Sequence, residues 1–470
     1  MRLPDWHRTK IICTLGPATD VDGVVEGLVS AGMDLARINL SHGTHSDHAR
    51  RIAAVRNAAE RIGQPVAILA DLPGPKFRLD TLATGVHELR ASAIVILGPA
   101  GDAMHDLPVR DPGFLVALKV GDRLYLADGA VELVVTASSP PQVTCQVLIG
   151  GEVRSGSGIH APEADLGISV PTDDDRRHLS FALEQRVEWI GVSFVQHAED
   201  LARIRTCFPI GCGALLMAKI EKRRAIDELE AIVASSDGIM VARGDLGVET
   251  DIAEIPLLQK RIIAAANARG RPVVTATQML ESMVQNEHPT RAEVTDIANA
   301  VLDGTDAVML SAETAVGAYP VSAVEILSRV ITATETQPSV LRNGDTADRG
   351  SADVTDALGL VATQLAVRIG AAAIIAVVHD FETAATIARF RPGVPLVVLS
   401  ESQSLARALV AIRGIAPLYS ASGNDAAHCV DEAGKWLHAR GLCRCDAAGI
   451  LLLPANPCDR KLNSLRIVSL

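Results

Sequence analysis

Eight short apolar runs recur along the chain, and polar residues stand at their carboxyl ends. They span residues 11–16, 35–41, 66–72, 189–195, 215–221, 238–246, 273–280 and 307–313. Segments of helical length with apolar residues every three to four positions separate most of them. Apolar strands that alternate with helices indicate a parallel sheet covered on both faces. The pattern predicts a (β/α)8 TIM barrel, whose active site lies at the carboxyl ends of the strands.

The barrel pattern is interrupted once and followed by a further domain. Residues 76–168 carry short strand patterns with Gly, Pro and Asp-Gly turns, which predict a small inserted β-barrel lid domain after the third strand. A polar stretch at 336–355 predicts a linker, and strands alternating with helices beyond it predict a C-terminal α/β domain. We expect the barrel over 1–75 and 169–340, and the last domain over 350–470.

Composition restricts the classes of partner and the compartment. The net charge of −12 disfavours nucleic acid and anionic membrane surfaces as partners. No apolar run reaches the roughly 18 residues that cross a bilayer, and no signal-peptide pattern opens the chain. The eight cysteines form no CxxC pair, which favours reduced thiols in a cytoplasmic protein.

Cationic and acidic residues end the fifth and sixth runs. Lys219 and Glu221 are two positions apart and therefore face the same side, and Asp245 ends the next run. Two carboxylates from adjacent strands can hold Mg²⁺, and a neighbouring lysine can hold a phosphoryl group. A lone lysine–glutamate pair is more often a structural ion pair, but Arg37 on the same rim favours function.

The second and third runs end in further polar residues. Arg37, Asn39 and Ser41 alternate and face one way, with Asp71 next to them. An arginine here suits bidentate binding of phosphate or carboxylate. The oxygens of the other three make either a monovalent-cation site or a hydrogen-bond cluster.

Three further residues are weaker candidates when each is taken by itself. Gly244, in ARGDLG, lets backbone N–H groups approach an anion, although a tight turn explains it equally. Thr277 can hydrogen-bond a substrate carboxylate or relay a proton, but threonine is also common in strands. His42 follows in a loop and by itself is more typical of a surface histidine.

Taken together, the motifs resemble those of the pyruvate kinase family. They are TKIICTLGPAT, MDLARINLSHG, AKIE, VARGDLGVE, ATQMLESM and PTRAEVTDIANAVLDGTDAVMLSAET. The resemblance covers about residues 8–75 and 170–340 and is looser in the lid and the C-terminal domain. It implies phosphoryl transfer from phosphoenolpyruvate to ADP, giving pyruvate and ATP, with Mg²⁺ as cofactor, Mn²⁺ as its alternative, and a homotetramer.

The resemblance also implies a role for each matched position. By this resemblance, Arg37 binds the transferring phosphate, Lys219 stabilises its developing charge, and Glu221 and Asp245 hold Mg²⁺. The substrate carboxylate is held by Gly244 and Asp245 with Thr277, and Thr277 acts through water in protonating the enolate. The nucleotide is contacted by Asn39, His42 and Arg78, and K⁺ is held by Asn39, Ser41, Asp71 and Leu72.

The chain departs from the family pattern at several positions. Lys76 stands where the family commonly has glutamate, and lysine there resembles a built-in substitute for K⁺, so we expect K⁺ to be dispensable. Asp174 stands where the family often has a nucleotide-binding lysine, which Arg176 or Arg177 could replace. Ala312 and Val316 replace a glycine and a lysine, without a functional account.

The loop that binds a sugar phosphate in many relatives also differs. It reads Asp380-Phe381-Glu382-Thr383-Ala384 here, so glycine's flexible backbone is absent and two acids face any incoming phosphate. Because like charges repel, we expect no fructose bisphosphate activation through this loop.

Two alternatives remain open at this point. One is an aldolase or lyase on a phosphoenolpyruvate-binding barrel, which would share the metal carboxylates and the arginine. Lys219 beside Glu221, together with the inserted lid, argues against it. The other is a non-catalytic paralogue, and retention of the full set of charged residues argues against that.

Overall fold

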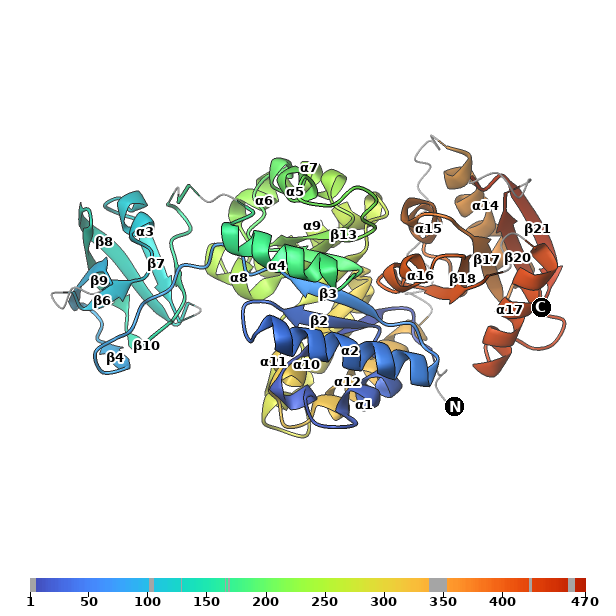
Figure 1. Cartoon of the computed structure of the whole chain (residues 1–470), viewed down its shortest axis with the longest axis horizontal. Helices are drawn as coiled ribbons and strands as arrows, with labels where there is room; N and C mark the ends of the chain where they lie inside the picture. The colour runs from blue at the N-terminus through green and yellow to red at the C-terminus, as the bar shows by residue number, and fades with distance from the viewer. Residues whose placement is uncertain are drawn as a thin grey trace.

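The computed structural model of the chain describes residues 6–100, 105–127, 129–164, 166–167, 170–337, 353–421, 425–454 and 461–470. Figure 1 shows three bodies in a row: an all-β body, a central barrel surrounded by helices, and a C-terminal α/β body. The N-terminus lies beside the central body and the C-terminus lies in the last one.

The central body is a closed parallel barrel with strand order β1-β16-β15-β14-β13-β12-β3-β2. This confirms the predicted (β/α)8 fold. Its strands are β1 (Lys10–Leu15), β2 (Leu35–Asn39), β3 (Ala67–Asp71), β12 (Trp189–Val192), β13 (Leu215–Ile220), β14 (Gly238–Ala242), β15 (Val273–Ala276) and β16 (Ala307–Leu310). The sixth run was expected to be a strand as far as Asp245, but β14 ends at Ala242 and Asp245 lies in the first turn of a helix.

Helices surround the barrel, and local sequence signals set their ends. Helix α2, for example, begins after Thr44, which caps the backbone N–H of Asp47, and ends at Gly63 with a positive φ of 73°. The helices are η1 (Pro17–Thr19), α1 (Val24–Ala31), α2 (His45–Ile62), α4 (Asp173–Glu184), α5 (Ala198–Arg205), α6 (Arg223–Asp227), α7 (Leu229–Ser235), α8 (Arg243–Glu249), α9 (Ile255–Ala268), η2 (Glu281–Val284), α10 (Arg291–Asp303), α11 (Ala312–Ala315) and α12 (Pro320–Glu335).

The all-β body is inserted between β3 and α4. It contains a six-stranded sheet, β11-β7-β8-β9-β5-β6, and a two-stranded sheet, β10-β4, where the sequence predicted a small β-barrel. Its elements are β4 (Val86–Leu89), β5 (Ile94–Pro99), β6 (Leu107–Val109), α3 (Pro112–Ala117), β7 (Arg123–Leu126), β8 (Val131–Ser139), β9 (Gln142–Ile149), β10 (Gly151–Arg154) and β11 (Ile159–His160). The apolar side of these strands packs into a core of its own.

The C-terminal body is a five-stranded sheet, β19-β18-β17-β20-β21, in which only β21 runs antiparallel to its neighbour. Its elements are α14 (Val354–Ile369), β17 (Ala373–Val377), α15 (Phe381–Ala388), β18 (Leu396–Ser400), α16 (Gln403–Leu409), β19 (Ile415–Tyr419), α17 (Ala426–Ala439), β20 (Ala448–Leu453) and β21 (Ser464–Ser469). Most of the predicted linker at 336–355 lies outside the described residues.

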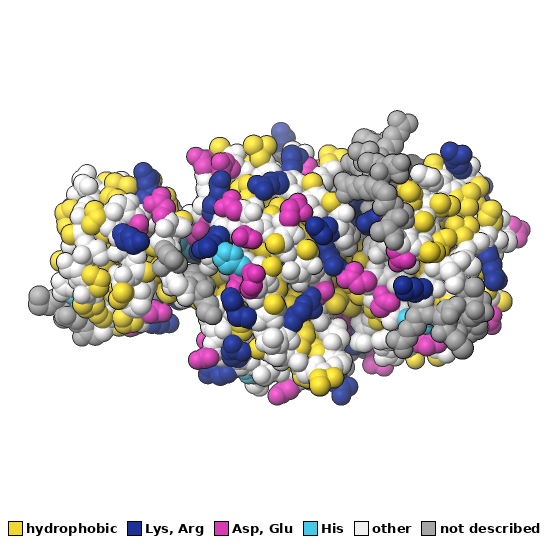
Figure 2. All heavy atoms as spheres, turned by 90° about the horizontal axis from the view of Figure 1, so that it is seen from above, with side chains coloured by type: hydrophobic (Ala, Val, Ile, Leu, Met, Phe, Trp, Pro, Cys, Tyr) yellow, Lys and Arg dark blue, Asp and Glu magenta, His cyan; other side chains and the backbone are white. Residues whose placement is uncertain are grey.

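The C-terminal body packs against the barrel end opposite the strands' carboxyl ends. Trp189, at the start of β12, donates its indole N–H to the Ala408 carbonyl at 3.1 Å and meets the Phe381 ring edge-on at 5.4 Å between centroids. Figure 2 shows basic and acidic side chains interspersed over the central body, whereas hydrophobic side chains gather on part of the C-terminal body. The catalytic candidates therefore lie at the barrel end nearer the all-β body.

Candidate active site

Four charged side chains from the ends of β2, β3 and β13 form one connected network, across the intervening strand β12. Arg37 at the end of β2 contacts Asp71 of β3 at 2.6 Å, through Nη2 and Oδ2. Lys219 of β13 places Nζ 3.2 Å from Asp71 Oδ1 and 2.7 Å from Glu221 Oε1. Asp71, Lys219 and Glu221 are almost fully buried. The sequence expectation that these side chains face the same mouth is therefore met.

Burial and mutual attraction determine the charge states of this network. Burial alone would favour a neutral Lys219, but Asp71 and Glu221 outweigh it and raise the lysine pKa. Burial would likewise raise the Asp71 pKa, but Lys219 and Arg37 hold it below its ordinary value. The site therefore presents two cations, Arg37 and Lys219, to an anion that enters the mouth.

Asp245, Gly244 and Thr277 meet where β14 and β15 end. Helix α8 begins at Arg243, so Gly244 and Asp245 occupy its first turn. The backbone N–H of Gly244 donates to Thr277 Oγ1 at 2.9 Å, and Thr277 holds a positive φ of 68°, which is costly for a residue with a β-branched side chain. Arg243 fixes this loop by donating to the Thr277 carbonyl at 2.5 Å. A strained but well-held threonine is common at binding sites.

Glu221 and Asp245 form a donor set that suits a divalent cation. Burial raises the pKa of Glu221, Lys219 opposes that shift, and the negative charge of Asp245 adds to it. A hard cation between the two carboxylates would relieve this repulsion. Among the described residues, no group of three or more His, Cys, Asp or Glu side chains is placed to hold a metal. This arrangement suits Mg²⁺, which uses one or two carboxylates and fills its other positions with water and substrate oxygens.

The residues expected around a monovalent cation lie beside Lys76. Lys76 Nζ donates to Ser41 Oγ at 3.2 Å, and Asn39 Oδ1 accepts the Ser41 backbone N–H at 3.2 Å. Burial lowers the pKa of Lys76, as does the charge of Lys219, while Asp71 opposes the shift. The ammonium group thus lies within hydrogen-bond distance of Ser41, one of the residues expected to hold K⁺.

The carbonyl of Leu72 was expected to be a K⁺ ligand. It accepts a hydrogen bond from Ser193 Oγ at 2.7 Å, while the Leu72 backbone N–H donates to Gly191 at 2.9 Å. Ser193 in turn accepts from Lys219 Nζ at 2.7 Å. This carbonyl is therefore already engaged, through Ser193, in the hydrogen-bond network around Lys219.

The expected nucleotide side lies under the all-β body. A cavity of about 90 Å³ is lined by Lys76, Arg78 and Asp245 among others, which places lid and barrel residues in one cleft. The pKa of His42 is lowered by partial burial and then by the charges of Lys76 and Arg78. A cationic pocket of this kind suits a polyphosphate.

Asp174, which stands where the family often has a nucleotide-binding lysine, lies on the exposed first turn of α4. Asp174 pairs there with Arg177. Arg176, the other suggested substitute, donates to Cys207 Sγ at 3.0 Å. Both arginines therefore have partners on the barrel surface, and neither is among the residues that line the 90 Å³ cavity.

Sequence reasoning missed several residues that hold the site together. Thr14 Oγ1 accepts from Arg37 Nη1 at 3.0 Å, and the Phe194 backbone N–H donates to Glu221 Oε2 at 2.8 Å. Ser193 lies beside Lys219 and accepts a hydrogen bond from its Nζ. Glu313 accepts the Leu280 and Ser311 backbone N–H groups and so supports the scaffold. None of these contacts has a signal in sequence spacing.

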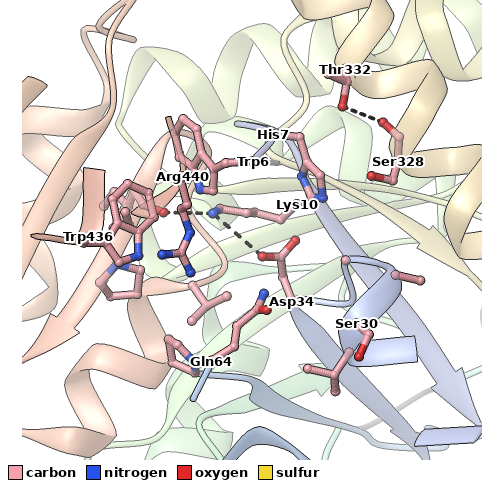
Figure 3. Close-up of a pocket in the computed structure, with 18 of the residues that line it drawn as sticks. Trp6, His7, Lys10, Ser30, Asp34, Gln64, Ser328, Thr332, Trp436 and Arg440 are labelled. Atoms are coloured by element: carbon pink, nitrogen blue, oxygen red, sulfur yellow. Dashed lines mark hydrogen bonds and ion pairs between the residues drawn. The ribbon is translucent and has the colours of Figure 1, made fainter. Parts of the chain in front are cut away.

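Another cavity lies elsewhere, between the opposite barrel end and the C-terminal body. It measures about 400 Å³ and is lined by Trp6, Lys10, Asp34, Trp436 and Arg440 among others. In Figure 3, Lys10 and Asp34 point toward one another, and Lys10 Nζ donates to the Ile415 carbonyl at 2.8 Å. The cavity contains none of the strand-end residues described above.

The loop expected to lack a sugar-phosphate site is tied to the barrel. Asp380 caps α15 by accepting the Thr383 backbone N–H at 2.8 Å, and Glu382 pairs with Arg271. Phe381 is buried against Trp189. Glu382 and Phe381 thus join the C-terminal body to the barrel.

Comparisons with known proteins show the family to which the chain is similar. Residues 6–324 match the family model described as pyruvate kinase, barrel domain, and residues 356–468 match pyruvate kinase, alpha/beta domain. A pyruvate kinase of Agrobacterium vitis is 39% identical over 448 residues, which cover 91% of this chain and 90% of that protein.

Two further relatives carry the same name. A pyruvate kinase of Mycobacterium tuberculosis is 42% identical over 400 residues, covering 84% of each chain. One from Geobacillus stearothermophilus is 37% identical over 420 residues, covering 87% of this chain and 71% of that protein. In the described parts of the chain, no helix is both long and apolar enough to cross a membrane. The chain belongs to the pyruvate kinase family.

Proposed function

We propose that the chain transfers the phosphoryl group of phosphoenolpyruvate to ADP and releases pyruvate and ATP. The observation that carries the proposal is the joined network of Arg37, Asp71, Lys219 and Glu221 at one end of the barrel. Phosphoryl transfer depends on positioning and charge neutralisation more than on covalent chemistry. Two cations beside two carboxylates meet that need.

Each side chain has a role that follows from its chemistry. Arg37 holds the transferring phosphoryl group through its planar, bidentate guanidinium. Lys219, kept charged by its buried acidic neighbours, stabilises the charge that develops on the equatorial oxygens. Mg²⁺ or Mn²⁺ held by Glu221 and Asp245 supplies Lewis-acid neutralisation when bound.

The organic part of the substrate is held on the other side of the mouth. The Gly244 and Asp245 backbone N–H groups at the start of α8, with the Thr277 hydroxyl, bind its carboxylate. In the free protein the Gly244 N–H already donates to Thr277, so a carboxylate exchanges one hydrogen bond for others. Thr277, through water, delivers the proton that converts the enolate to pyruvate.

The nucleotide and the monovalent cation meet at the lid. Asn39, His42 and Arg78 contact ADP, with Arg78 delivered by closure of the lid. Lys76 replaces K⁺ beside Ser41, Asn39 and Asp71, and the 3.2 Å contact with Ser41 supports this. Turnover is then independent of K⁺.

We also propose that the enzyme is cytoplasmic and assembles as a homotetramer. Val354 and Val361, which lie seven positions apart and so share one face of α14, are 58% and 49% exposed, which supports a subunit contact on that face.

The activity is tested by following pyruvate formation in a coupled assay with phosphoenolpyruvate, ADP and Mg²⁺. The parent chain should form pyruvate only when ADP is present, and Glu221→Gln and Lys219→Met should each lose roughly 10²-fold or more in kcat. Pyruvate formation that does not depend on ADP would contradict the proposal and favour a lyase.

A further inference from the structure

A second buried ion pair lies beside the proposed metal carboxylates, and its lysine, Lys222, lines the same 90 Å³ cavity as Asp245. Lys222 follows Glu221 at the start of α6, and its Nζ lies 2.5 Å from Glu249 Oε1. The side chains of Lys222 and Glu249 are 10% and 3% exposed. A buried pair with this geometry is costly to break, because removing one partner leaves an uncompensated charge.

Glu249 links this pair to the substrate-binding turn. It is the last residue of α8, and the first turn of that helix carries Gly244 and Asp245. Burial raises the pKa of Glu249, Lys222 opposes the shift, and Asp245 and Glu221 add to it, so the three carboxylates lie within electrostatic reach of one another. The pair therefore joins the end of α8 to the second residue after β13.

Phe194 connects the same lysine to Glu221 and to the lid. Its ring lies 5.1 Å from Lys222 Nζ, and its backbone N–H donates to Glu221 Oε2 at 2.8 Å. It adopts a positive φ of 60°, a strained state that the surroundings must enforce. The ring also lies so close to Gly74 that a Cβ there would come within 2.6 Å of it. Lys222 thus contacts the residue that orients Glu221.

We propose that Lys222 and Glu249 are positioning residues that set the distance and orientation between Glu221 and Asp245. Glu221 is held through Phe194, and Asp245 is held through the register of α8 against β13. The inference rests on the proposed function, since it takes Glu221 and Asp245 to be the metal ligands. Outer residues of this kind typically change metal affinity 10- to 100-fold when they are replaced.

A charge-only role and a positioning role predict opposite results for Lys222→Met. Removal of a cation near two carboxylates should by itself tighten binding of a divalent cation. Loss of positioning should weaken it. The double variant Lys222→Met with Glu249→Gln separates the two further, because it removes one charge of each sign and leaves the net charge unchanged.

The experiment measures Mn²⁺ binding to the full chain by the electron paramagnetic resonance signal of the free ion. We expect the dissociation constant to rise about 10-fold or more in Lys222→Met and in the double variant, and to return to within about 3-fold of the parent in Lys222→Arg. The KM for phosphoenolpyruvate should rise in parallel, because Gly244 moves with α8.

The matched control removes the Lys260–Asp303 ion pair, which joins α9 to α10 on the outer helical layer. Lys260→Met with Asp303→Asn should leave Mn²⁺ binding unchanged, and thermal unfolding confirms that each variant is folded at the assay temperature. Mn²⁺ binding in the double variant within 2-fold of the parent would overturn the proposal. Because this readout needs no turnover, a parent chain that fails to transfer phosphate would disprove the function without deciding the positioning role.

Discussion

The replacement Lys76→Glu tests how this site balances its charge. Lys76 Nζ lies 3.2 Å from Ser41 Oγ, so glutamate would reverse the charge at the position proposed to replace K⁺. The change amounts to two units beside the buried Asp71. Loss of one well-placed charge in such a site costs roughly 10²–10³-fold in rate, which corresponds to about 3–4 kcal/mol.

The assay measures turnover of phosphoenolpyruvate and ADP with Mg²⁺ and either tetramethylammonium or K⁺ as the sole monovalent cation. The parent chain should turn over at similar rates in both. Lys76→Glu should lose about 10²–10³-fold in tetramethylammonium and recover most of that loss in K⁺. Lys119→Glu, a charge reversal elsewhere in the lid, serves as control. A parent chain that is nearly inactive until K⁺ is added would refute the reasoning.

Three further predictions follow from the charges and contacts. Burial and Asp245 raise the Glu221 pKa, so acidification should weaken Mn²⁺ binding already at pH values above the ordinary carboxylate pKa. Mn²⁺ affinity that stays constant until the pH falls below about 4.3 would contradict this. Burial lowers the His48 pKa to about 4, so stability should decline as pH falls from about 6.5 toward 4, by at most roughly 3 kcal/mol, and His48→Asn should flatten the thermal midpoint against pH. Fructose 1,6-bisphosphate should not activate through the loop at Glu382, and an activation that Thr383→Ala removes would disprove it.

The sign for His48 follows from its surroundings. It is 2% exposed, and neither ring nitrogen has a hydrogen-bond partner among the described residues. After burial, the positive charge of Arg51 contributes most to the lowered pKa of His48, and Asp47 opposes it. His48 is therefore protonated at a lower pH in the folded state than in the unfolded state, so acid favours unfolding.

The barrel could be predicted because two separate sequence signals mark each of its strands. Each is apolar along its length, and each is followed by helical periodicity, so neither signal depends on distant contacts. The alternation that placed Lys219 and Glu221 on one side is likewise a local property of a strand. Asp245 shows the limit of that reasoning, since the chain enters helix α8 directly after Ala242.

The supporting contacts could not be predicted for a physical reason. Arg37 with Thr14 and Lys222 with Glu249 join residues 23 and 27 positions apart. The pairing of β1 with β2 and of β13 with β14 brings them together. Phe194 adopts its strained φ because neighbouring elements enforce it, not because phenylalanine favours it. Such contacts depend on tertiary packing, which leaves no regular period in the sequence.

The most direct test of the central claim follows the phosphorus atom itself. The parent chain is mixed with phosphoenolpyruvate, ADP and Mg²⁺, and ³¹P nuclear magnetic resonance records where the phosphoryl group goes. We predict that the phosphoenolpyruvate signal is replaced in equal amount by the γ-phosphate of ATP, and that Lys219→Met slows the exchange roughly 10²–10³-fold. Release of the phosphorus as inorganic phosphate, with ADP unchanged, would contradict the account.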